Sequence, residues 1–112
     1  MLRTKSSGGP SPEHLFAALG EPTRLRIIDS LSRGGSRSIA SLAADSSVTR
    51  QALTKHLRVL EHVGLVIPRK VGRESRFALQ GERLAEASSY LTSIARQWED
   101  ALGRLKAHIE QG

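Results

Sequence analysis

Apolar residues recur every three or four positions along most of the chain, a spacing typical of helices with one buried face. Ser11 is expected to cap a first helix over residues 12–19, and Pro22 is expected to open a second over residues 22–33. Proline is favourable at the first position of a helix, because the N–H that it lacks would have no partner there. Glycines follow both segments, as they do at many helix ends. The expected apolar faces comprise Leu15, Phe16 and Leu19 in the first helix and Leu25, Ile28 and Leu31 in the second.

Two further helices are expected on either side of a polar turn. A short helix from about residue 38 to 44 precedes the turn Asp45-Ser46-Ser47, and a longer helix runs from about Arg50 to Val63. Thr49 is a favourable N-cap for the longer helix. Two helices joined in this way are the layout of a helix-turn-helix. The apolar side chains are Ile39, Leu42 and Ala43 in the short helix and Leu53, Leu57, Leu60 and Val63 in the longer one.

A small hairpin is expected directly after the longer helix. Gly64 ends that helix, and two short strands are expected over residues 65–67 and 75–79. The basic stretch from Pro68 to Glu74 between them is expected to form the hairpin loop, which would be a wing beside the helix. The pattern therefore predicts a mainly helical fold with a small β-hairpin, a winged helix-turn-helix with about five helices.

The end of the chain is expected to form one long helix from about residue 82 to 110, roughly 40 Å in length at 1.5 Å per residue. Its apolar residues alternate steps of three and four, and they form a stripe that one small domain cannot cover. We therefore expect this helix and the first helix to pack against a second copy of the chain, although coverage by the helix's own domain is the alternative. The expected dimer contacts are Leu15, Phe16, Leu84, Tyr90, Leu91, Ile94, Trp98, Leu102, Leu105 and Ile109.

Length and composition limit the classes of protein to which the chain can belong. With 112 residues it fits one domain: an N-terminal arm over residues 1–11, a winged helix-turn-helix over 12–80, and a C-terminal helix over 81–112 of the same compact domain. The absence of cysteine excludes disulfides, thiolate metal sites and thiol catalysis. No apolar run approaches the roughly 18 residues of a membrane-spanning helix, and the N-terminus lacks the pattern of a signal peptide. We expect a soluble cytoplasmic protein.

Positive charge is concentrated in the second half of the predicted winged helix-turn-helix. The net charge of the chain is +6, and seven basic against two acidic residues between Arg50 and Arg76 give this segment +5 of it. Such charge indicates an acidic partner, either nucleic acid or an anionic membrane surface. On an exposed helix face, arginine suits guanine O6 and N7 and glutamine suits adenine N6 and N7, while basic wing residues suit phosphates. The expected DNA contacts are Arg50, Gln51, Thr54, Lys55 and Arg58 on the helix and Arg69, Lys70, Arg73 and Arg76 on the hairpin.

The chain resembles the ArsR-type (arsenic-repressor-like) winged-helix regulators of bacteria and archaea. Three segments carry the resemblance, in the family order and over residues 13–80: LFAALGEPTRLRIIDSL, SIASLAADSSVTRQALTKHLRVLEHVGLV and VGRESRFAL. It implies recognition-helix contacts by Thr49, Arg50, Gln51, Thr54 and Lys55 and wing contacts by Arg73 and Arg76. His56 matches a common family histidine, for which bracing of the helix or a phosphate contact is expected. Ser47 stands at a position of the turn where the family often has glycine. This departure bears on the geometry of the turn and not on the fold.

The resemblance also implies a homodimer that represses transcription from a palindromic operator. Its two recognition helices would lie about one DNA turn apart, roughly 34 Å. Many family members sense metals, but residues 38–42 offer no ligand stronger than a hydroxyl, and His14, His56, His62 and His108 are scattered along the chain. Because zinc needs three or four converging ligands, no metal site and no cofactor are expected. Whether a small-molecule effector binds between the helices of the dimer stays open.

Two other classes of function compete with a DNA-binding regulator. An enzyme is not expected, because the chain has no nucleophile elbow and no glycine-rich loop between a strand and a helix. The remaining alternative is a winged-helix module for protein interaction or for nonspecific binding of nucleic acid, RNA included. A helix face for nonspecific binding would need only lysine and arginine, so the presence of Gln51 and Thr54 favours base recognition over that alternative. We therefore expect a sequence-specific regulator of double-stranded DNA, a homodimeric repressor associated with the nucleoid when bound.

Overall fold

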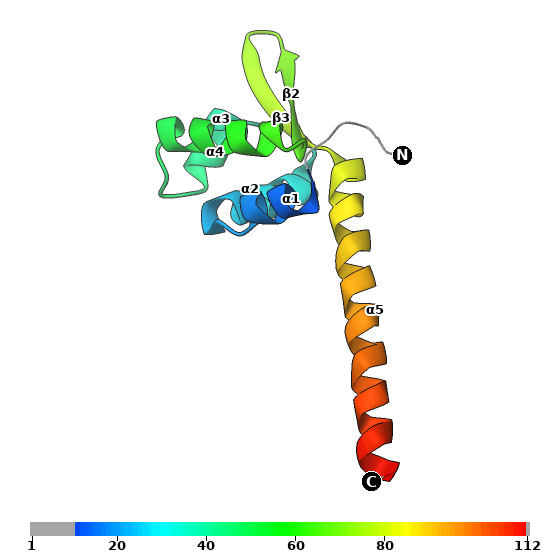
Figure 1. Ribbon diagram of the computed structural model, residues 1–112. Helices are drawn as coiled ribbons and strands as arrows, with labels where there is room; N and C mark the ends of the chain where they lie inside the picture. Colours follow the sequence, from blue (N-terminus) through cyan, green and yellow to red (C-terminus); the bar gives the residue numbers. More distant parts are fainter. Residues whose placement is uncertain (1–10, 112) are drawn as a thin grey trace.

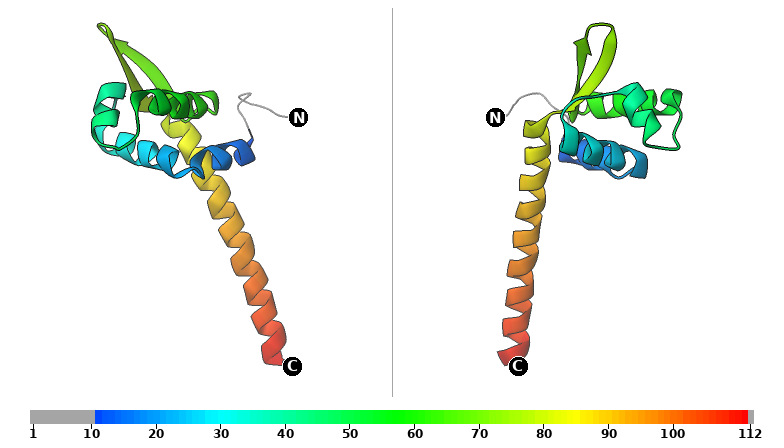
Figure 2. Two further views of the ribbon diagram at one scale, coloured as in Figure 1. Left: turned by 90° about the vertical axis from the view of Figure 1, so that its left-hand side faces the viewer. Right: turned by 180° about the vertical axis from the view of Figure 1, so that it is seen from behind.

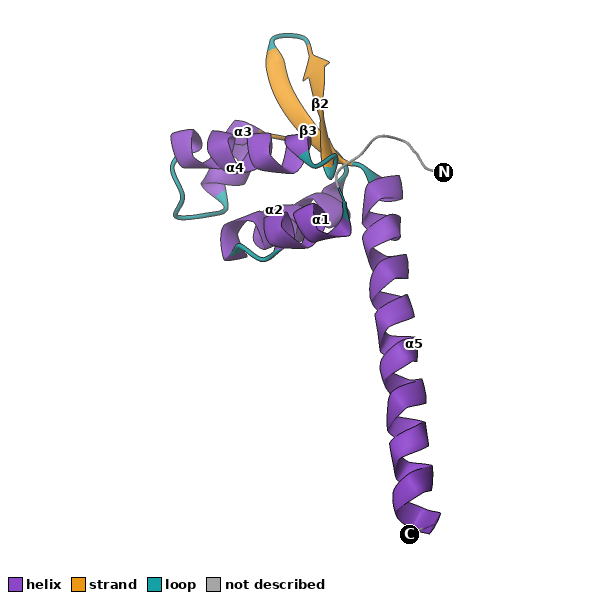
Figure 3. Ribbon diagram, viewed as in Figure 1, coloured by secondary structure: helices purple, strands orange, loops and turns teal. Residues whose placement is uncertain are grey.

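The computed structural model describes residues 11–111, and this part of the chain has the predicted winged helix-turn-helix fold (Figure 1). The arm expected over residues 1–11 lies, apart from Ser11, outside the described residues. The elements in chain order are α1 Pro12–Leu19, α2 Pro22–Gly34, β1 Arg37–Ser38, α3 Ile39–Ala44, α4 Arg50–His62, β2 Val66–Val71, β3 Glu74–Leu79 and α5 Gly81–Gln111. Figure 3 shows the four short helices and the hairpin on one side and the long α5 on the other.

Two of the helix N-termini test the predicted caps. Thr49 caps α4 as expected: its hydroxyl accepts a hydrogen bond from the backbone N–H of Ala52 at 3.1 Å. Ser11 occupies the N-cap position of α1 as predicted, but its side chain makes no capping hydrogen bond to the helix. The Ser11 hydroxyl instead bonds Nδ1 of His14 at 2.8 Å. The hydrogen bond between them satisfies both side chains. Because Pro12 at the first position of α1 has no N–H, the helix also has one fewer N–H group that needs a cap.

The apolar face of α2 differs from the predicted one by one residue. Ile28 and Leu31 are buried as expected, but Leu25 is 53% exposed and Ile27 is buried in its place. At 100° per residue, Leu25 lies about 120° around the helix from the middle of the face formed by Ile27, Ile28 and Leu31. A step of three residues is therefore insufficient to keep Leu25 on the buried side.

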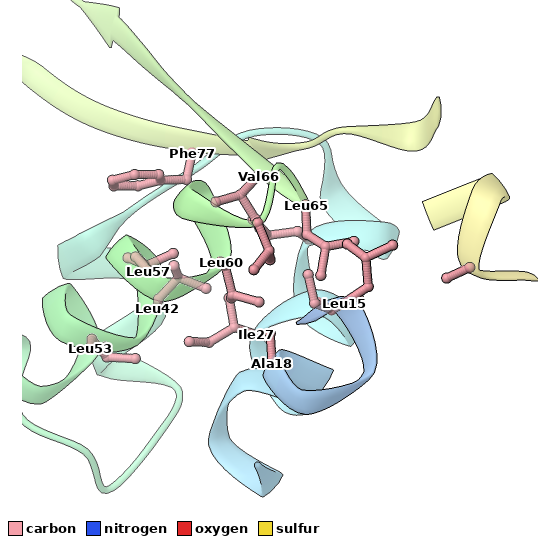
Figure 4. Close-up of a cluster of buried hydrophobic side chains, with 14 residues drawn as sticks. Leu15, Ala18, Ile27, Leu42, Leu53, Leu57, Leu60, Leu65, Val66 and Phe77 are labelled. Carbon is pink, nitrogen blue, oxygen red and sulfur yellow. The ribbon is translucent and has the colours of Figure 1, made fainter. Parts of the chain in front are cut away.

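The hydrophobic core lies between the first four helices and the base of the hairpin (Figure 4). Leu53, Leu57 and Leu60 of α4 are almost fully buried, as the stripe on this helix predicts. Leu65 and Val66 continue the core from the end of α4 into β2, and at about 25 cal/mol per Å² such burial is the main force that holds α4 in place. The other buried apolar residues are Leu15, Ala18, Ile27, Ile28, Leu31, Leu42, Val63, Phe77 and Ala87.

The sheet is larger than the predicted hairpin. Its strands are antiparallel in the order β1-β3-β2, and the short β1, which the sequence pattern does not predict, pairs with β3. The expected seven-residue loop is wrong: residues 68–71 and Glu74 lie in the strands, and only Gly72 and Arg73 form the turn. Gly72 has a φ of 63°, which glycine adopts without strain. Pro68 is tolerated because β2 is an edge strand, whose outer N–H groups need no partner.

The helix α5 extends well beyond the rest of the molecule (Figure 2). It has 31 residues, which corresponds to about 46 Å at 1.5 Å per residue, and the described part of the chain measures 68 × 37 × 21 Å. Its first turns pack against α1, where the rings of Phe16 and Tyr90 lie 5.7 Å apart between centroids. Within residues 11–111, no helix is sufficiently long and apolar to span a membrane.

Candidate nucleic-acid interface

The helix α4 presents one polar face to solvent while its apolar face is held in the core. α4 packs against both α2 and α3, and the turn of residues 45–49 joins it to α3. Since Leu53, Leu57 and Leu60 fix the rotation of the helix about its axis, the opposite face of the helix is turned to solvent. The exposed basic and amide side chains are Arg50, Gln51, Lys55 and Arg58.

The side chains of these four residues have no hydrogen bond or ion pair within the part of the chain that the structure describes. Their donors and acceptors are therefore open to an external partner. Arginine and glutamine offer bidentate patterns that match single bases in the major groove, and lysine and arginine also suit phosphates. Arg50 and Gln51 are the first two residues of α4, the end of a recognition helix that reaches the bases.

Two threonines predicted as DNA contacts already use part of their hydrogen-bonding capacity. The Thr49 hydroxyl accepts from the N–H of Ala52, so that its own O–H remains available as a donor. The Thr54 hydroxyl donates to the carbonyl of Arg50 at 2.8 Å, so that its lone pairs and methyl group remain available. Thr49 is thus suited to an acceptor such as a phosphate, and Thr54 to a base donor or a thymine methyl group.

His56 is turned toward the protein rather than toward solvent. Its side chain is 22% exposed, and its Nδ1 lies 3.3 Å from Nη1 of Arg24 and 3.8 Å from Oε1 of Glu21, both on the N-terminal side of α2. The pKa of Glu21 is lowered, first by the hydrogen bond from the backbone N–H of Arg24 and also by the positive charge of the Arg24 guanidinium. This geometry favours the bracing role for His56 over a direct base contact.

The hairpin of β2 and β3 carries the other predicted basic residues. The hairpin projects beyond the helices (Figure 1), and Arg69, Lys70 and Arg73 on it are exposed. Arg76 is different: its guanidinium donates to Oγ of Ser36 at 2.9 Å, to the carbonyl of Ser36 at 2.7 Å and to Glu74 at 2.8 Å. Arg76 therefore fastens the hairpin to the segment before β1, while the side chains of the other three have no hydrogen bond or ion pair with residues 11–111.

The predicted dimer residues divide into a buried and an exposed group. Leu15 is buried in the core, and Leu84 and Ile94 are half-buried. Phe16 is half-buried beneath the ring of Tyr90. Ile94 and Trp98 line a shallow hollow of about 240 Å³ on α5. The exposed members of the predicted surface are Tyr90, Leu91, Trp98, Leu102, Leu105 and Ile109.

The sequence pattern does not single out two arginines that the structure places around the helix-turn-helix. Arg24 contacts His56 on α4, and its only sequence signal is its position three residues after Glu21, the spacing of a helix cap. Arg37 bonds α2, α3 and the turn, and no local pattern indicates this. The described residues 11–111 contain no group of three His, Cys, Asp or Glu side chains that could hold a metal ion.

Known proteins match this chain over the helix-turn-helix. A family described as a helix-turn-helix domain matches residues 19–69. The HTH-type transcriptional regulator Rv2034 of Mycobacterium tuberculosis is 34% identical over 92 residues, which are 82% of this chain and 82% of that protein. The structure of an ArsR-like transcriptional regulator from Rhodococcus sp. RHA1 has a TM-score of 0.74 and 39% identity, and the match covers 85% of this chain and 89% of that one. The chain belongs to the ArsR-type family.

A further relative of this ArsR-type chain is the transcriptional repressor SmtB homolog of Synechocystis sp. It is 32% identical over 87 residues, which are 78% of this chain and 60% of that protein. The ArsR-type chain is thus a transcriptional regulator with a helix-turn-helix DNA-binding domain, to which α2, α3 and α4 contribute. These relatives confirm the predicted family and the prediction of a regulator rather than an enzyme.

Proposed function

We propose that this ArsR-type regulator binds a specific double-stranded DNA operator as a homodimer and represses transcription by covering the promoter. The observation that carries the proposal is the exposed face of α4. Arg50 and Gln51 stand at the start of this helix with their side chains free of partners in residues 11–111. Both residue types form bidentate contacts with single bases, which a face needed only for charge or solubility would not require.

Separate groups of residues read the bases and bind the phosphates. Arg50 and Gln51 contact base edges, and Thr54 adds an acceptor or a methyl contact beside them. Each bidentate contact contributes about 1–3 kcal/mol of discrimination against a wrong base. Phosphates are bound by the side chains that surround this centre: Thr49, Lys55, Arg58, Arg69, Lys70 and Arg73. His56 and Arg76 support the interface from within the protein, because their side chains bond neighbouring elements.

The homodimer rests on the apolar stripe of α5. Trp98 is 64% exposed, and five further large apolar or aromatic residues of this helix are also exposed. A stripe of this length on a lone helix would be costly in water, and a second copy of the same helix covers it by symmetry. The two copies of α4 would then lie about one DNA turn apart, roughly 34 Å, which corresponds to a palindromic operator.

Repression is the direction of regulation that we propose, and no effector is part of the proposal. A dimer that spans two half-sites within a promoter would exclude the polymerase from the same DNA. One relative, the SmtB homolog of Synechocystis sp., is itself named a transcriptional repressor, which supports this direction. The regulator would act in the cytoplasm, on the DNA of the nucleoid.

Selection from random duplex DNA tests the proposal directly. The full-length protein is incubated with a library of random duplexes, and the bound sequences are recovered over several rounds. We expect a palindrome with half-sites centred about 10 base pairs apart, which is one helical turn. Recovery of unrelated sequences would contradict specific recognition and would favour a nonspecific nucleic-acid-binding or protein-interaction module.

A further inference from the structure

One arginine outside the predicted interface joins three parts of the helix-turn-helix. Arg37 lies in β1, and its Nη1 donates to the hydroxyl of Ser30 on α2. Its Nε and Nη2 donate to the hydroxyl of Ser41 on α3 at 3.0 and 2.6 Å, and Nη2 also donates to the Ser41 carbonyl at 3.1 Å. Nη2 lies 2.6 Å from Oδ2 of Asp45, the first residue of the turn that leads into α4. A single side chain therefore connects α2, α3 and the turn.

The turn itself has mainly local hydrogen bonds. Within residues 45–48, the N–H of Ser46 donates to the carbonyl of Ala43 at 3.2 Å, and the hydroxyl of Ser46 accepts from the N–H of Val48 at 3.2 Å. The first bond ties the turn to the end of α3 and the second lies within the turn, so neither bond reaches α2. Val48 packs against the core, and the ion pair of Arg37 with the turn adds a polar connection to α2, since the same guanidinium is bonded to that helix.

The bonding of Arg37 leaves it little capacity for an external anion. All three guanidinium nitrogens donate within the protein, and the side chain is 21% exposed. Arg50 on α4 is exposed, and its side chain has no such partners among residues 11–111. Arg37 is therefore fitted to hold the protein together rather than to bind a phosphate. Charge-assisted bonds of this kind are about twice as strong as bonds between neutral groups.

We infer that Arg37 is a positioning residue for DNA recognition, which fixes α3 and the turn against α2 and so refines the angle, set in the first place by the core packing of α4, at which α4 presents its base-reading face. The inference rests on the proposed function. Base contacts are directional hydrogen bonds, so a small rotation of α4 weakens them, whereas phosphate contacts by flexible lysine and arginine side chains tolerate it. Loss of the Arg37 contacts should therefore reduce specificity more than overall affinity for DNA.

The variants that test this inference are expected to fold. Arg37→Met keeps the aliphatic stem and removes the donors. The Asp45 side chain is 65% exposed, and the cluster faces an open cleft of about 600 Å³, so water can solvate the carboxylate that loses its partner. Arg37 also lies outside the hydrophobic core. Arg33→Met is a matched control, because Arg33 is an exposed arginine that forms an ion pair with Asp29 on its own helix.

The decisive experiment measures binding of the full-length variants to the selected operator and to a scrambled duplex at several salt concentrations. For Arg37→Met we expect operator affinity to fall at least about tenfold, or 1.4 kcal/mol, and affinity for the scrambled duplex to stay within about twofold. The slope of the logarithm of the binding constant against log[salt] should be the same as in the wild type. Arg37→Lys should restore part of the loss, and Arg33→Met should leave the ratio of the two affinities unchanged.

Two results would overturn the inference. One is an operator-to-scrambled ratio for Arg37→Met equal to that of the wild type. The other is an equal loss on both duplexes with a salt slope smaller by about 0.9, because that is the signature of one lost phosphate contact. If the wild type itself shows no preference, the proposed function fails, and the role of Arg37 in recognition fails with it.

Hydrogen exchange of the free protein tests, without DNA, whether Arg37 fixes the turn. In Arg37→Met and in the milder Asp45→Asn, the amides of residues 45–49 should exchange faster than in the wild type, whereas those of the α4 core should not. Asp45→Asn also provides the binding test in the event that Arg37→Met does not fold, with a smaller loss of operator preference expected. If the amides of the turn exchange at the wild-type rate in both variants, Arg37 does not fix the turn, even where the wild type binds its operator specifically.

Discussion

Arg24 contacts His56 across the packing of α2 against α4, with Nη1 of the arginine 3.3 Å from Nδ1 of the histidine. The same guanidinium donates through Nε to the carbonyl of Ala18 in α1 at 2.7 Å. Oε1 of Glu21, the N-cap of α2, lies 3.8 Å from the same Nδ1. Because α1 packs against α5, these contacts form a continuous path from the predicted dimer helix to the recognition helix.

A double-mutant cycle should show that Arg24 and His56 support the same packing. Arg24→Met and His56→Ala should each lower the free energy of unfolding by about 1–2 kcal/mol, since each breaks a half-buried hydrogen bond with a charged donor. The double variant should lose less than the sum of the two, with a coupling of at least about 0.5 kcal/mol. Urea unfolding measures the free energy of unfolding of the two single variants and of the double variant. Arg26→Met, at an exposed position of α2, is the control. Fully additive losses would mean that the contact does not stabilise the fold.

The lowered pKa of Glu21 predicts part of the acid sensitivity of the protein. The bond from the Arg24 N–H stabilises the charged carboxylate, so the pKa in the folded state lies below the ordinary value of 4.5. A depressed pKa contributes stability that is present above the unfolded value and is lost as pH falls through the folded one. Glu21→Gln should therefore be less stable than the wild type near neutral pH, and the gap should shrink as the pH falls from about 5.5 to about 3.

Urea unfolding of both proteins across this range provides the test. Glutamine retains an oxygen that can accept the capping bond, so the variant is expected to fold. A difference in unfolding free energy that stays constant with pH would show that the charge of Glu21 does not stabilise the native state.

Base contacts and phosphate contacts should respond differently to alanine substitution. Arg50→Ala and Gln51→Ala should each cost about 1–3 kcal/mol at the operator and relax the preference at one base position. Arg73→Ala should weaken operator and scrambled DNA alike and reduce the salt slope by about 0.9. Titrations against both duplexes at several salt concentrations measure these effects. Equal losses on both duplexes for all three variants would contradict the assigned roles.

Trp98 should be essential for dimerisation. It is large and exposed on the apolar stripe of α5, and removal of a tryptophan from the centre of an interface often costs 2 kcal/mol or more, about a thirtyfold rise in the dissociation constant. We expect Trp98→Ala to sediment as a monomer at micromolar concentration, where the wild type sediments as a dimer. Arg96→Ala, two residues away on another face of the helix, should not change the profile. An unchanged profile for Trp98→Ala would exclude the proposed interface.

Local signals in the sequence account for most of the helical part of the fold. The N-cap at Thr49 and the stripe of Leu53, Leu57 and Leu60 define α4, and both involve residues within a few positions of one another. The prediction of Leu25 as a buried residue is wrong for a local reason also, because a step of three does not return to the same face indefinitely. Periodicity thus places the recognition helix correctly and gives its rotation.

The contacts that fasten the elements together were not predictable in this way. Arg76 bonds Ser36, which is 40 residues earlier in the chain, and β1 is recognisable as a strand only through its pairing with β3. Arg37 appears in the sequence as one basic residue among serines, and its role depends on how α2 and α3 pack. Such pairings join residues from separate elements, so only the folded structure identifies them.

The ratio of affinities for the selected operator and a scrambled duplex of the same length, measured at one physiological salt concentration, tests the central claim most directly. Specific regulators exceed their own nonspecific binding by about a thousandfold or more. We predict a ratio of at least about 10³ for the dimer, with most of it lost in Gln51→Ala and Arg50→Ala combined. Equal affinity for the two duplexes would mean that the exposed face of α4 is only a basic surface and that the chain does not read sequence.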